Sequence, residues 1–352
     1  MSASFAVFES AGGATIFRLP IQAFPNFWAY VYVVQRGKNT ILIDAGSGTE
    51  TSHEDLLNGL KRANLSPSDL THILLTHAHI DHYGGLTKLK PLTNAKIGCH
   101  ELDAQTVAHH DAKLALMSKR LASFLAETGL AEETRDSLLS VYRFTKSLYQ
   151  SVPVDFMYES QNMQVGPFEM IHLPGHCAGH VAIRLDDSVF CGDMVVEGVT
   201  PHLYPETIGA YNGLAHYLDS LERFQRWADG ARLILNGHDD VITNLPERID
   251  ATHKNLIRRM SKAIEELAKP MTIAEVCDAV YGKTEGYNQL LVIEKTGAYV
   301  EYFYERGMIE IVNADEVEQG LPARYRRLYG ESEMREELRR KINAETCVQV
   351  DT

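Results

Sequence analysis

One short run, from His77 to His82 (HAHIDH), limits what this chain can be more than any other feature of the sequence. Side chains alternate in an extended segment, so His77 and His79 share one side of it. Asp81 and His82 follow directly, and a turn at this point aims them at a neighbouring position. Imidazole and carboxylate groups are ligands that suit zinc, iron or manganese. The run therefore predicts half of a metal centre, with two ligands for each of two ions.

Three later segments each place a histidine or an aspartate beside a glycine at the end of a predicted strand. Glycine permits the tight turns that such loops need, and loops on a rigid strand scaffold are where binding residues concentrate. A preorganised metal centre needs ligands held in this way, so these segments complete the predicted set. They are Pro174–His180 (PGHCAGH), Cys191–Asp193 (CGD) and Asn236–Asp239 (NGHD).

The chain is acidic, with 34 basic residues, 47 acidic residues and a net charge of −13. Phosphate neutralisation needs clustered lysine and arginine, so this balance disfavours a dedicated nucleic-acid binder. Hydrophobic residues make up 45% of the 352 positions, which is typical of a globular protein able to bury a large core. The length predicts one large domain and a smaller one.

Neither secretion nor membrane insertion is indicated by the sequence. Residues 1–11 lack a basic segment followed by a long apolar stretch, and no apolar run reaches the ~18 residues of a membrane span. The cysteines are odd in number, widely spaced and without a C-x-x-C pair, so neither a disulfide framework nor a zinc ribbon fits. We therefore expect a cytoplasmic protein with no membrane partner. The cysteines are Cys99, Cys177, Cys191, Cys277 and Cys347.

Segments rich in β-forming residues predict packed layers of strands and helices. The first two, Trp28–Gln35 and Thr40–Asp44, are joined by a turn with glycine and asparagine and predict a hairpin. Ser52 is predicted to cap the next helix, and Thr71–Leu75 is a buried strand leading into the histidine run. Metal-type residues at the ends of such strands suggest an α/β fold. Later strands are expected at Met157–Glu159, Phe168–Leu173, Val181–Leu185, Ser188–Cys191 and Arg232–Asn236, with a helix at Gly213–Trp227.

Two other parts of the chain have helical apolar spacing. Residues 101–150 contain no proline and one glycine, Gly129, and predict two or three helices between the second and third metal motifs. This position predicts a cap, at about 101–152, over a substrate cleft. Beyond Pro246, three helices and a short strand predict a small helical, winged-helix-like module. These elements are expected at Glu247–Ala268, Thr272–Tyr281, Tyr287–Arg306 and Ile309–Val312.

These patterns divide the chain into a metal domain (1–246, including the cap), a helical module (247–330) and a charged tail (331–352). The tail is rich in glutamate and arginine and is expected to be solvated or frayed. Apolar residues of the module's third helix predict either packing onto the first domain or a homodimer interface, and spacing leaves both open. They include Leu290, Leu291, Val300 and Tyr304.

In their order, H-x-H-x-D-H, then G-H, then G-D, then G-H, the motifs resemble those of the metallo-β-lactamase superfamily. The resemblance covers roughly residues 14–245, and Asp44 after the second strand is the counterpart of a first motif. It implies a four-layer αββα sandwich, here with a helical insert and the C-terminal module. The motif set is similar to that of glyoxalase-II-like enzymes, and the C-terminal module is similar to that of the β-lactamase-like-protein-2 group.

The resemblance implies a role for each matching residue. His77, His79 and His176 resemble the ligands of a first metal ion, and Asp193 resembles the carboxylate that bridges both ions. The ligands of the second ion are matched by Asp81, His82 and His238. Asp44 resembles a carboxylate behind the ligands that orients their loop, and His180 is similar to a supporting residue near the site.

A binuclear metal-dependent hydrolase is the activity that this resemblance implies. Its two divalent ions are expected to be zinc, with iron or manganese also compatible with the ligand set. A hydroxide held between them attacks a substrate carbonyl, and one ion stabilises the oxyanion. Asp81, which faces this hydroxide, is expected to orient it and to pass its proton to the leaving group. A non-catalytic metal-binding scaffold is the alternative of a different class, and it predicts metal binding without turnover.

The substrate predicted from the apolar insert and the acidic balance is a small acyl thioester of the acyl-CoA type. A lactone or single-stranded RNA is the alternative, since the superfamily hosts many reactions. Tyr204 and Tyr211 follow the bridging Asp193 at loop-like distance, and either is a candidate for contact with the substrate oxyanion. Packing is the alternative for both tyrosines. The stretch His109–Asp111 is interpreted as solvated or lid-packing, not as a third metal site.

Overall fold

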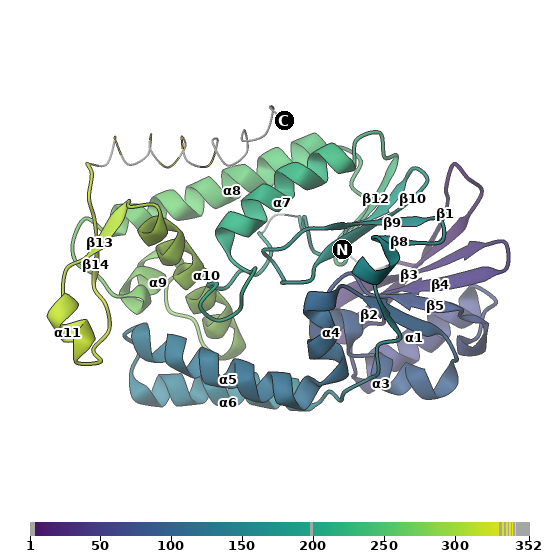
Figure 1. The fold of residues 1–352 in the computed structure, drawn as a ribbon, viewed down its shortest axis with the longest axis horizontal. Helices are drawn as coiled ribbons and strands as arrows, with labels where there is room; N and C mark the ends of the chain where they lie inside the picture. Colours follow the sequence, from purple (N-terminus) through teal and green to yellow (C-terminus); the bar gives the residue numbers. More distant parts are fainter. Residues whose placement is uncertain are drawn as a thin grey trace.

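Two β-sheets packed face to face form the centre of this protein (Figure 1). The structure, a computed structural model, describes residues 4–197 and 200–330 together with residues 333, 336, 338, 340 and 342. The predicted charged tail thus lies outside the described residues, except for those five positions. Among the described residues, no helix has the length and apolar character needed to cross a membrane.

The first sheet has seven strands that follow one another in chain order from β1 to β7. Strands β1 to β4 pair antiparallel, and β4 to β7 pair parallel. The predicted hairpin is confirmed as β3 and β4, whose register places Val33 opposite Leu42. The strands are β1 (Ala6–Glu9), β2 (Thr15–Phe24), β3 (Phe27–Arg36), β4 (Asn39–Ile43), β5 (His72–Leu74), β6 (Lys96–Cys99) and β7 (Phe156–Met157).

The second sheet has five strands in the order β12-β11-β10-β9-β8. Strands β11 and β12 are parallel, while the other neighbours are antiparallel. This arrangement brings the end of β9, the start of β10 and the ends of β11 and β12 to one edge. The strands are β8 (Gln164–Val165), β9 (Phe168–His172), β10 (Val181–Leu185), β11 (Ser188–Phe190) and β12 (Leu233–Leu235).

Alternating side chains give each sheet an inner and an outer apolar face. Ile41 and Ile43 of β4 lie in the core between the sheets, whereas Leu42 packs outward against helices. In β10, Ile183 points between the sheets and Ala182 points outward. Both outer faces must be covered because both are apolar.

Helices supply the two outer layers, so the predicted αββα sandwich is confirmed. The first sheet packs against α1 (Glu50–Arg62), α3 (Leu86–Leu89) and α4 (Glu101–Ala108), through residues such as Leu56 and Leu86. The second sheet packs against α7 (Leu214–Trp227) and α8 (Leu245–Glu266). A one-turn helix, α2 (Ile80–Tyr83), lies within the histidine run.

The insert forms three helices, α4 followed by α5 (His110–Glu127) and α6 (Glu132–Ser147). In Figure 1, α5 and α6 run beneath the molecule from the sheets to the C-terminal helices. The turn between them is attached there, because the backbone nitrogen of Ala274 donates to the carbonyl of Thr128 at 2.8 Å. The insert therefore bridges the sandwich and the C-terminal part of the chain.

The C-terminal part contains α8, α9 (Ile273–Tyr281), α10 (Gly286–Glu305), the short α11 (Ala314–Glu318) and a two-stranded sheet of β13 (Ile309–Ile311) and β14 (Tyr325–Arg327). Its apolar residues share one buried cluster with α5, α6 and α7. Leu290 and Val300 of α10 are buried within the chain, whereas Tyr304 is exposed. The predicted domain boundaries and the homodimer stay predictions.

Local predictions were wrong at two places. Thr49, not Ser52, caps α1: its side chain accepts the backbone N–H of Ser52 at 3.2 Å, so the helix begins three residues earlier. Ser52 instead accepts the backbone N–H of Ser47 through its hydroxyl at 2.9 Å. The predicted strand Met157–Glu159 is also displaced, because β7 ends at Met157 and Glu159 begins a 3₁₀ turn. Strands β1, β2, β6, β8 and β14 have no counterpart among the predicted strands.

Candidate metal centre

The histidine run begins where β5 ends and closes with the single helical turn α2. His79 is the residue before this turn, and Asp81 and His82 lie within it. The backbone N–H of His82 donates to the carbonyl of His79 at 2.9 Å, which fixes the tight turn. The imidazole rings of His77 and His79 lie 4.7 Å apart, so the extended part of the run puts both on one side, as alternation predicts.

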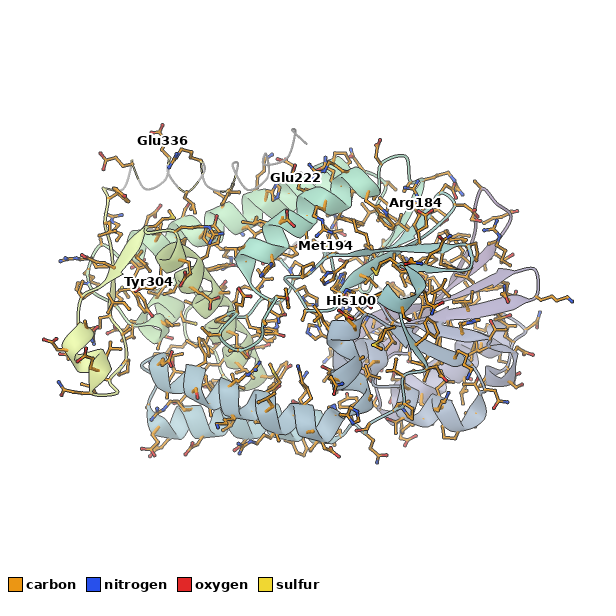
Figure 2. The ribbon with its side chains drawn as sticks, viewed as in Figure 1. His100, Arg184, Met194, Glu222, Tyr304 and Glu336 are labelled. Carbon is orange, nitrogen blue, oxygen red and sulfur yellow. The ribbon has the colours of Figure 1, made fainter. Side chains whose placement is uncertain are left out.

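The remaining ligand candidates come from loops at one edge of the second sheet. His176 lies between β9 and β10, Asp193 follows β11, and His238 follows β12. Met194, the residue after Asp193, is labelled in the middle of the molecule in Figure 2, between the sheets and the helical end. The edge of the sandwich thus faces the insert and the C-terminal helices.

Seven predicted ligands form two adjacent groups. His77, His79, His176 and Asp193 offer donor atoms within 4.8 Å of one another, and so do Asp81, His82 and His238. The Asp193 carboxylate lies between the groups. Its Oδ2 is 3.5 Å from His176 Nε2 and 3.1 Å from His238 Nε2, and its Oδ1 is 3.3 Å from His82 Nε2. The structure therefore gathers every residue that the sequence assigned to the metals, in the two sets expected.

In three histidines, a hydrogen bond made by Nδ1 turns Nε2 toward the ligand groups. The Nδ1–H of His176 donates to the carbonyl of His202 at 2.7 Å, and that of His238 donates to the carbonyl of Trp28 at 2.8 Å. His82 donates in the same way to the Asp44 carboxylate at 2.9 Å. Each Nε2 therefore faces the ligand groups, where its lone pair binds a metal once the ring is neutral.

The donor set fits divalent cations. Among the described residues, buried atoms without a hydrogen-bond partner include the Nε2 atoms of His77, His82 and His176 and Oδ1 of Asp193. Buried polar atoms are otherwise almost always satisfied, so four such atoms at one point indicate a missing positive partner. Nitrogen and carboxylate oxygen at this density are the ligands of zinc and of similar transition metals.

The pKa shifts of His77 and Asp193 also favour the binding of a cation. Burial lowers the pKa of His77 well below its usual value, and the neighbouring His82 and His79 act in the same direction. Burial alone would raise the pKa of Asp193, but positive charge on His238 and His82 holds it well below the ordinary range. His77 and Asp193 are thus in the states that bind a cation, a neutral imidazole and an ionised carboxylate, whereas His82 and His238 release a proton when a metal binds.

Asp44 holds the ligand loop from behind, as the resemblance implies. Its Oδ1 accepts the backbone N–H of Thr76 at 2.8 Å, and its Oδ2 accepts the Thr76 hydroxyl at 2.8 Å and His82 Nδ1–H at 2.9 Å. His180 supports the other side, where its Nε2 accepts the backbone N–H of Asp193 at 3.2 Å. Both residues therefore position ligands through hydrogen bonds.

A second buried carboxylate, Asp103 of α4, was not predicted from the sequence. Its Oδ2 accepts the backbone N–H of Ala78 at 2.8 Å, and its Oδ1 accepts that of Gly179 at 3.0 Å. Cys177 Sγ lies 3.4 Å from both oxygens. Asp103 thus ties the loop that carries His77 and His79 to the loop that carries His176. No spacing in the sequence announces it, since the aspartate stands alone in a helical stretch.

Replacing Asp103 by asparagine should weaken metal binding by about 10- to 100-fold, because such supporting residues typically contribute that much. The amide can accept one of the two backbone N–H groups but turns a donor toward the other, which should cost about 1–3 kcal/mol of stability. Metal titration and chemical denaturation measure the two effects. The matched control is Asp155→Asn, which removes a carboxylate that accepts the backbone N–H of Ile97 at 2.9 Å away from the site. Equal metal affinities in the two variants would contradict this role.

A cavity of about 1370 Å³ opens on the ligand groups. Its walls include α5, α6 and α10 and the loop after Asp193, and it reaches His79, Asp81 and His238. The predicted contact residues Tyr204 and Tyr211 both line it, Tyr204 half-buried and Tyr211 exposed. Contact with a substrate stays a prediction for both.

Helix α10 holds the loop that forms one wall of this cavity. Lys295 Nζ donates to the carbonyl and hydroxyl of Thr200 at 2.9 and 3.1 Å, and Glu294 lies 3.0 Å from Nε2 of His202. The Glu301 carboxylate accepts the backbone N–H groups of Glu206 and Thr207 at 2.8 and 3.2 Å. Since the His202 carbonyl also accepts the proton of His176 Nδ1, α10 is connected to a metal-ligand candidate.

The fold and this site together define the class of the protein. An αββα sandwich whose edge carries two adjoining His/Asp groups belongs to the metal-dependent hydrolases. The chain is a member of the metallo-beta-lactamase superfamily, whose family model matches residues 29–259. The predicted family is thereby confirmed, and the match extends into α8.

Curated relatives are distant but cover most of the chain. The probable metallo-hydrolase YqjP of Bacillus subtilis is 24% identical over 77% of this chain and 86% of its own length. An atrochrysone carboxyl ACP thioesterase of Pseudocercospora fijiensis is 24% identical over 74% of this chain and 62% of its own length. The beta-lactamase-like protein 2 homolog of Caenorhabditis elegans is 22% identical over 79% of both chains. The resemblance to the β-lactamase-like-protein-2 group is thus confirmed.

A solved structure shares the fold over nearly its whole length. A metallo-beta-lactamase family protein from Thermus thermophilus superimposes with a TM-score of 0.68 at 24% identity, covering 89% of this chain and 98% of that one. This coverage exceeds the residues 29–259 that match the family model. The shared fold therefore extends beyond the family match.

Proposed function

We propose that this protein is a binuclear metal-dependent hydrolase of acyl thioesters, of the acyl-CoA type. The observation that carries the proposal is the cavity, because it begins at the ligand groups and continues under the insert and α10. Its volume of about 1370 Å³ exceeds the roughly 300–1,000 Å³ of a typical small-ligand pocket, so it has room for an acyl chain and part of its carrier.

The walls of the cavity suit an apolar acyl group. Side chains from the first sheet, the insert and α10 present aromatic rings and aliphatic chains to its interior. An apolar chain gains about 0.8 kcal/mol for each methylene that it buries, which favours a substrate with a hydrocarbon portion. The apolar lining includes Phe24, Phe27, Trp28, Leu114, Met117, Leu121, Tyr142, Leu290 and Leu291.

Each of the two groups of metal-ligand candidates would hold one divalent ion, and Asp193 would contribute to both. When bound, the ions supply an activated water and a Lewis acid for the carbonyl oxygen. Asp81 lies at the cavity, with Oδ2 3.5 Å from His238 Nε2 and 3.8 Å from His82 Nε2. From there its carboxylate takes a proton from the attacking water and delivers it to the leaving sulfur.

The names of two relatives support this proposal, one for the reaction class and one for the substrate class. One is named a probable metallo-hydrolase and another an acyl-carrier-protein thioesterase, and both match about three quarters of this chain. Zinc is the metal that we propose, because histidine and carboxylate ligands are its usual set in catalytic sites. A lactone is the second carbonyl substrate that the same chemistry would accept. RNA suits the acidic chain less well, since its backbone requires basic contacts.

The test is a panel of acyl-CoA, hydroxyacyl-glutathione, lactone and phosphodiester substrates, assayed before and after metal removal. We expect CoA thioesters to be hydrolysed by the zinc-loaded protein, and dialysis against a chelator to remove this activity. Returning the metal should restore it, and the loaded protein should melt at a higher temperature because the ions bind the folded state. Absence of turnover for every CoA thioester by fully loaded protein would overturn the thioester proposal. Metal binding without turnover of any panel member would instead support the scaffold alternative.

A further inference from the structure

A half-buried lysine in the last turn of α6, Lys146, lines the cavity. Its Nζ lies 5.9 Å from the centre of the Tyr142 ring, also on α6. Beyond this ring, the described part of the chain offers its ammonium group neither a hydrogen bond nor an ion pair. A partly buried ammonium group that faces a cavity without a partner among the described residues is available to an anionic group of a bound ligand.

Buried hydrogen bonds fix the backbone of Lys146 against the helix that carries two metal-ligand candidates. The Tyr83 hydroxyl, on α2, lies 2.7 Å from Nδ1 of His110, and Nε2 of His110 lies 2.8 Å from the Lys146 carbonyl. His110 is also held through its backbone N–H, which donates to the Ser151 hydroxyl at 3.0 Å. The predicted lid-packing interpretation of His109–Asp111 therefore fits His110, which ties the insert to the ligand turn.

The acidic groups whose charge reaches Lys146 already have other partners. Burial lowers the pKa of Lys146, and the negative charges of Asp81 and Glu294 oppose this effect. Asp81 belongs to the second ligand group, and Glu294 pairs with His202. These carboxylates make the surroundings of Lys146 favourable for a cation but do not bind it directly.

Two other cations on the cavity wall have partners elsewhere. Lys295 donates to Thr200, and Arg120 donates to the carbonyl of Ile208 at 3.4 Å. Within the described part of the chain, Lys113 has no hydrogen bond or ion pair either, but its charge acts on Asp103, whereas the charge of Lys146 acts on the ligand candidate His79. Among the described residues, Lys146 is thus the cavity cation that the chain leaves both unpaired and close to the ligand groups.

We propose that Lys146 binds a carboxylate on the acyl chain of the substrate. The substrates would then be carboxyacyl thioesters, with the thioester carbonyl at the ligand groups and the free carboxylate a few carbons away at Lys146. This inference rests on the proposed thioesterase function and narrows its substrate class. The Tyr142 ring and the apolar walls would pack against the methylenes between the two groups.

The first experiment compares CoA thioesters in pairs of equal carbon number: propionyl with malonyl, butyryl with succinyl, and valeryl with glutaryl. The three pairs sample three separations between thioester and carboxylate. For at least one pair, we expect kcat/KM of the carboxyacyl member to be about 10-fold higher or more, the value of a charge-assisted hydrogen bond. Lys146→Met should abolish this preference, and Lys146→Gln serves if the methionine variant does not fold. Lys119→Met removes an exposed charge from α5 outside the cavity lining and should keep the preference.

The second experiment separates this inference from the proposed function. Calorimetry on zinc-reconstituted protein compares succinate with butyrate, and glutarate with valerate, since each member has one carboxylate for the metals. Tighter binding of the dicarboxylate that depends on Lys146 supports the subsite even when no thioester is hydrolysed. Hydrolysis of all thioester pairs without preference, together with equal binding of both acids, would overturn the subsite and leave the thioesterase function intact.

Discussion

Replacing Asp193 by asparagine should remove most of the activity and most of the bound metal. The carboxylate offers Oδ2 to the side of His176 and His238 and Oδ1 to the side of His82, so its two oxygens reach both ligand groups. An amide keeps the shape but replaces one anionic oxygen with a donor and removes the negative charge. We expect kcat/KM to fall on the order of 10³-fold, as when a strong transition-state contact is lost.

Elemental analysis and kinetics on the same preparation test this prediction. The variant should hold less metal per chain than the native protein, and added zinc should restore only part of the activity. Asp219→Asn, at a largely exposed aspartate of α7, is the control that should change neither quantity. Full metal content with full activity in the Asp193 variant would rule out its position between two ions.

Replacing Asp81 by alanine should reduce kcat by about 10²- to 10⁴-fold while the protein stays folded. The side chain lies at the cavity wall in a one-turn helix, and the backbone bonds of that turn do not involve it. The loss should therefore fall on proton transfer and on the second ligand group more than on stability. Kinetics at saturating zinc separate these contributions, because added metal compensates for weaker binding but not for a missing proton carrier.

The control for this prediction is Asp111→Ala, which removes another first-turn aspartate, from α5, that is exposed. Its kcat should equal that of the native protein. Circular dichroism and thermal melting should show both variants folded. If the Asp81 variant kept its full kcat at saturating metal, Asp81 would have no part in proton transfer.

The clustered His and Asp residues were predictable because each lies in a short sequence motif that can be recognised by itself. A glycine follows or precedes the ligand candidates at His176, Asp193 and His238, and each motif ends a strand whose apolar pattern is clear. Strand ends of one sheet edge meet in space, and the resemblance of the motif order to the superfamily supplied the division of the ligands into two groups. The helical insert was predictable for a similar reason, since residues 101–150 lack the prolines that would interrupt helices.

Residues that act between distant segments could not be predicted in this way. Asp103 bonds to Ala78 and Gly179, which are 25 and 76 positions away, and nothing near Asp103 in the sequence marks these partners. Lys146 depends likewise on Tyr83 and His110, whose contacts exist only after α2 and α6 pack together. The prediction of the residue that caps α1 was wrong for a local reason. Two hydroxyl residues, Thr49 and Ser52, are possible caps, and the extended backbone of Thr49 makes it the cap.

The bonds between α10 and the loop at Thr200–Thr207 mean that the metal centre is not a detachable module. Every ligand candidate precedes residue 239, yet the carbonyl that orients His176 belongs to a loop fastened by Glu294, Lys295 and Glu301. The C-terminal helices therefore help to set the position of His176 within the ligand set. Exchanging the C-terminal helices between relatives would therefore also change how firmly the His176 ring is held in position.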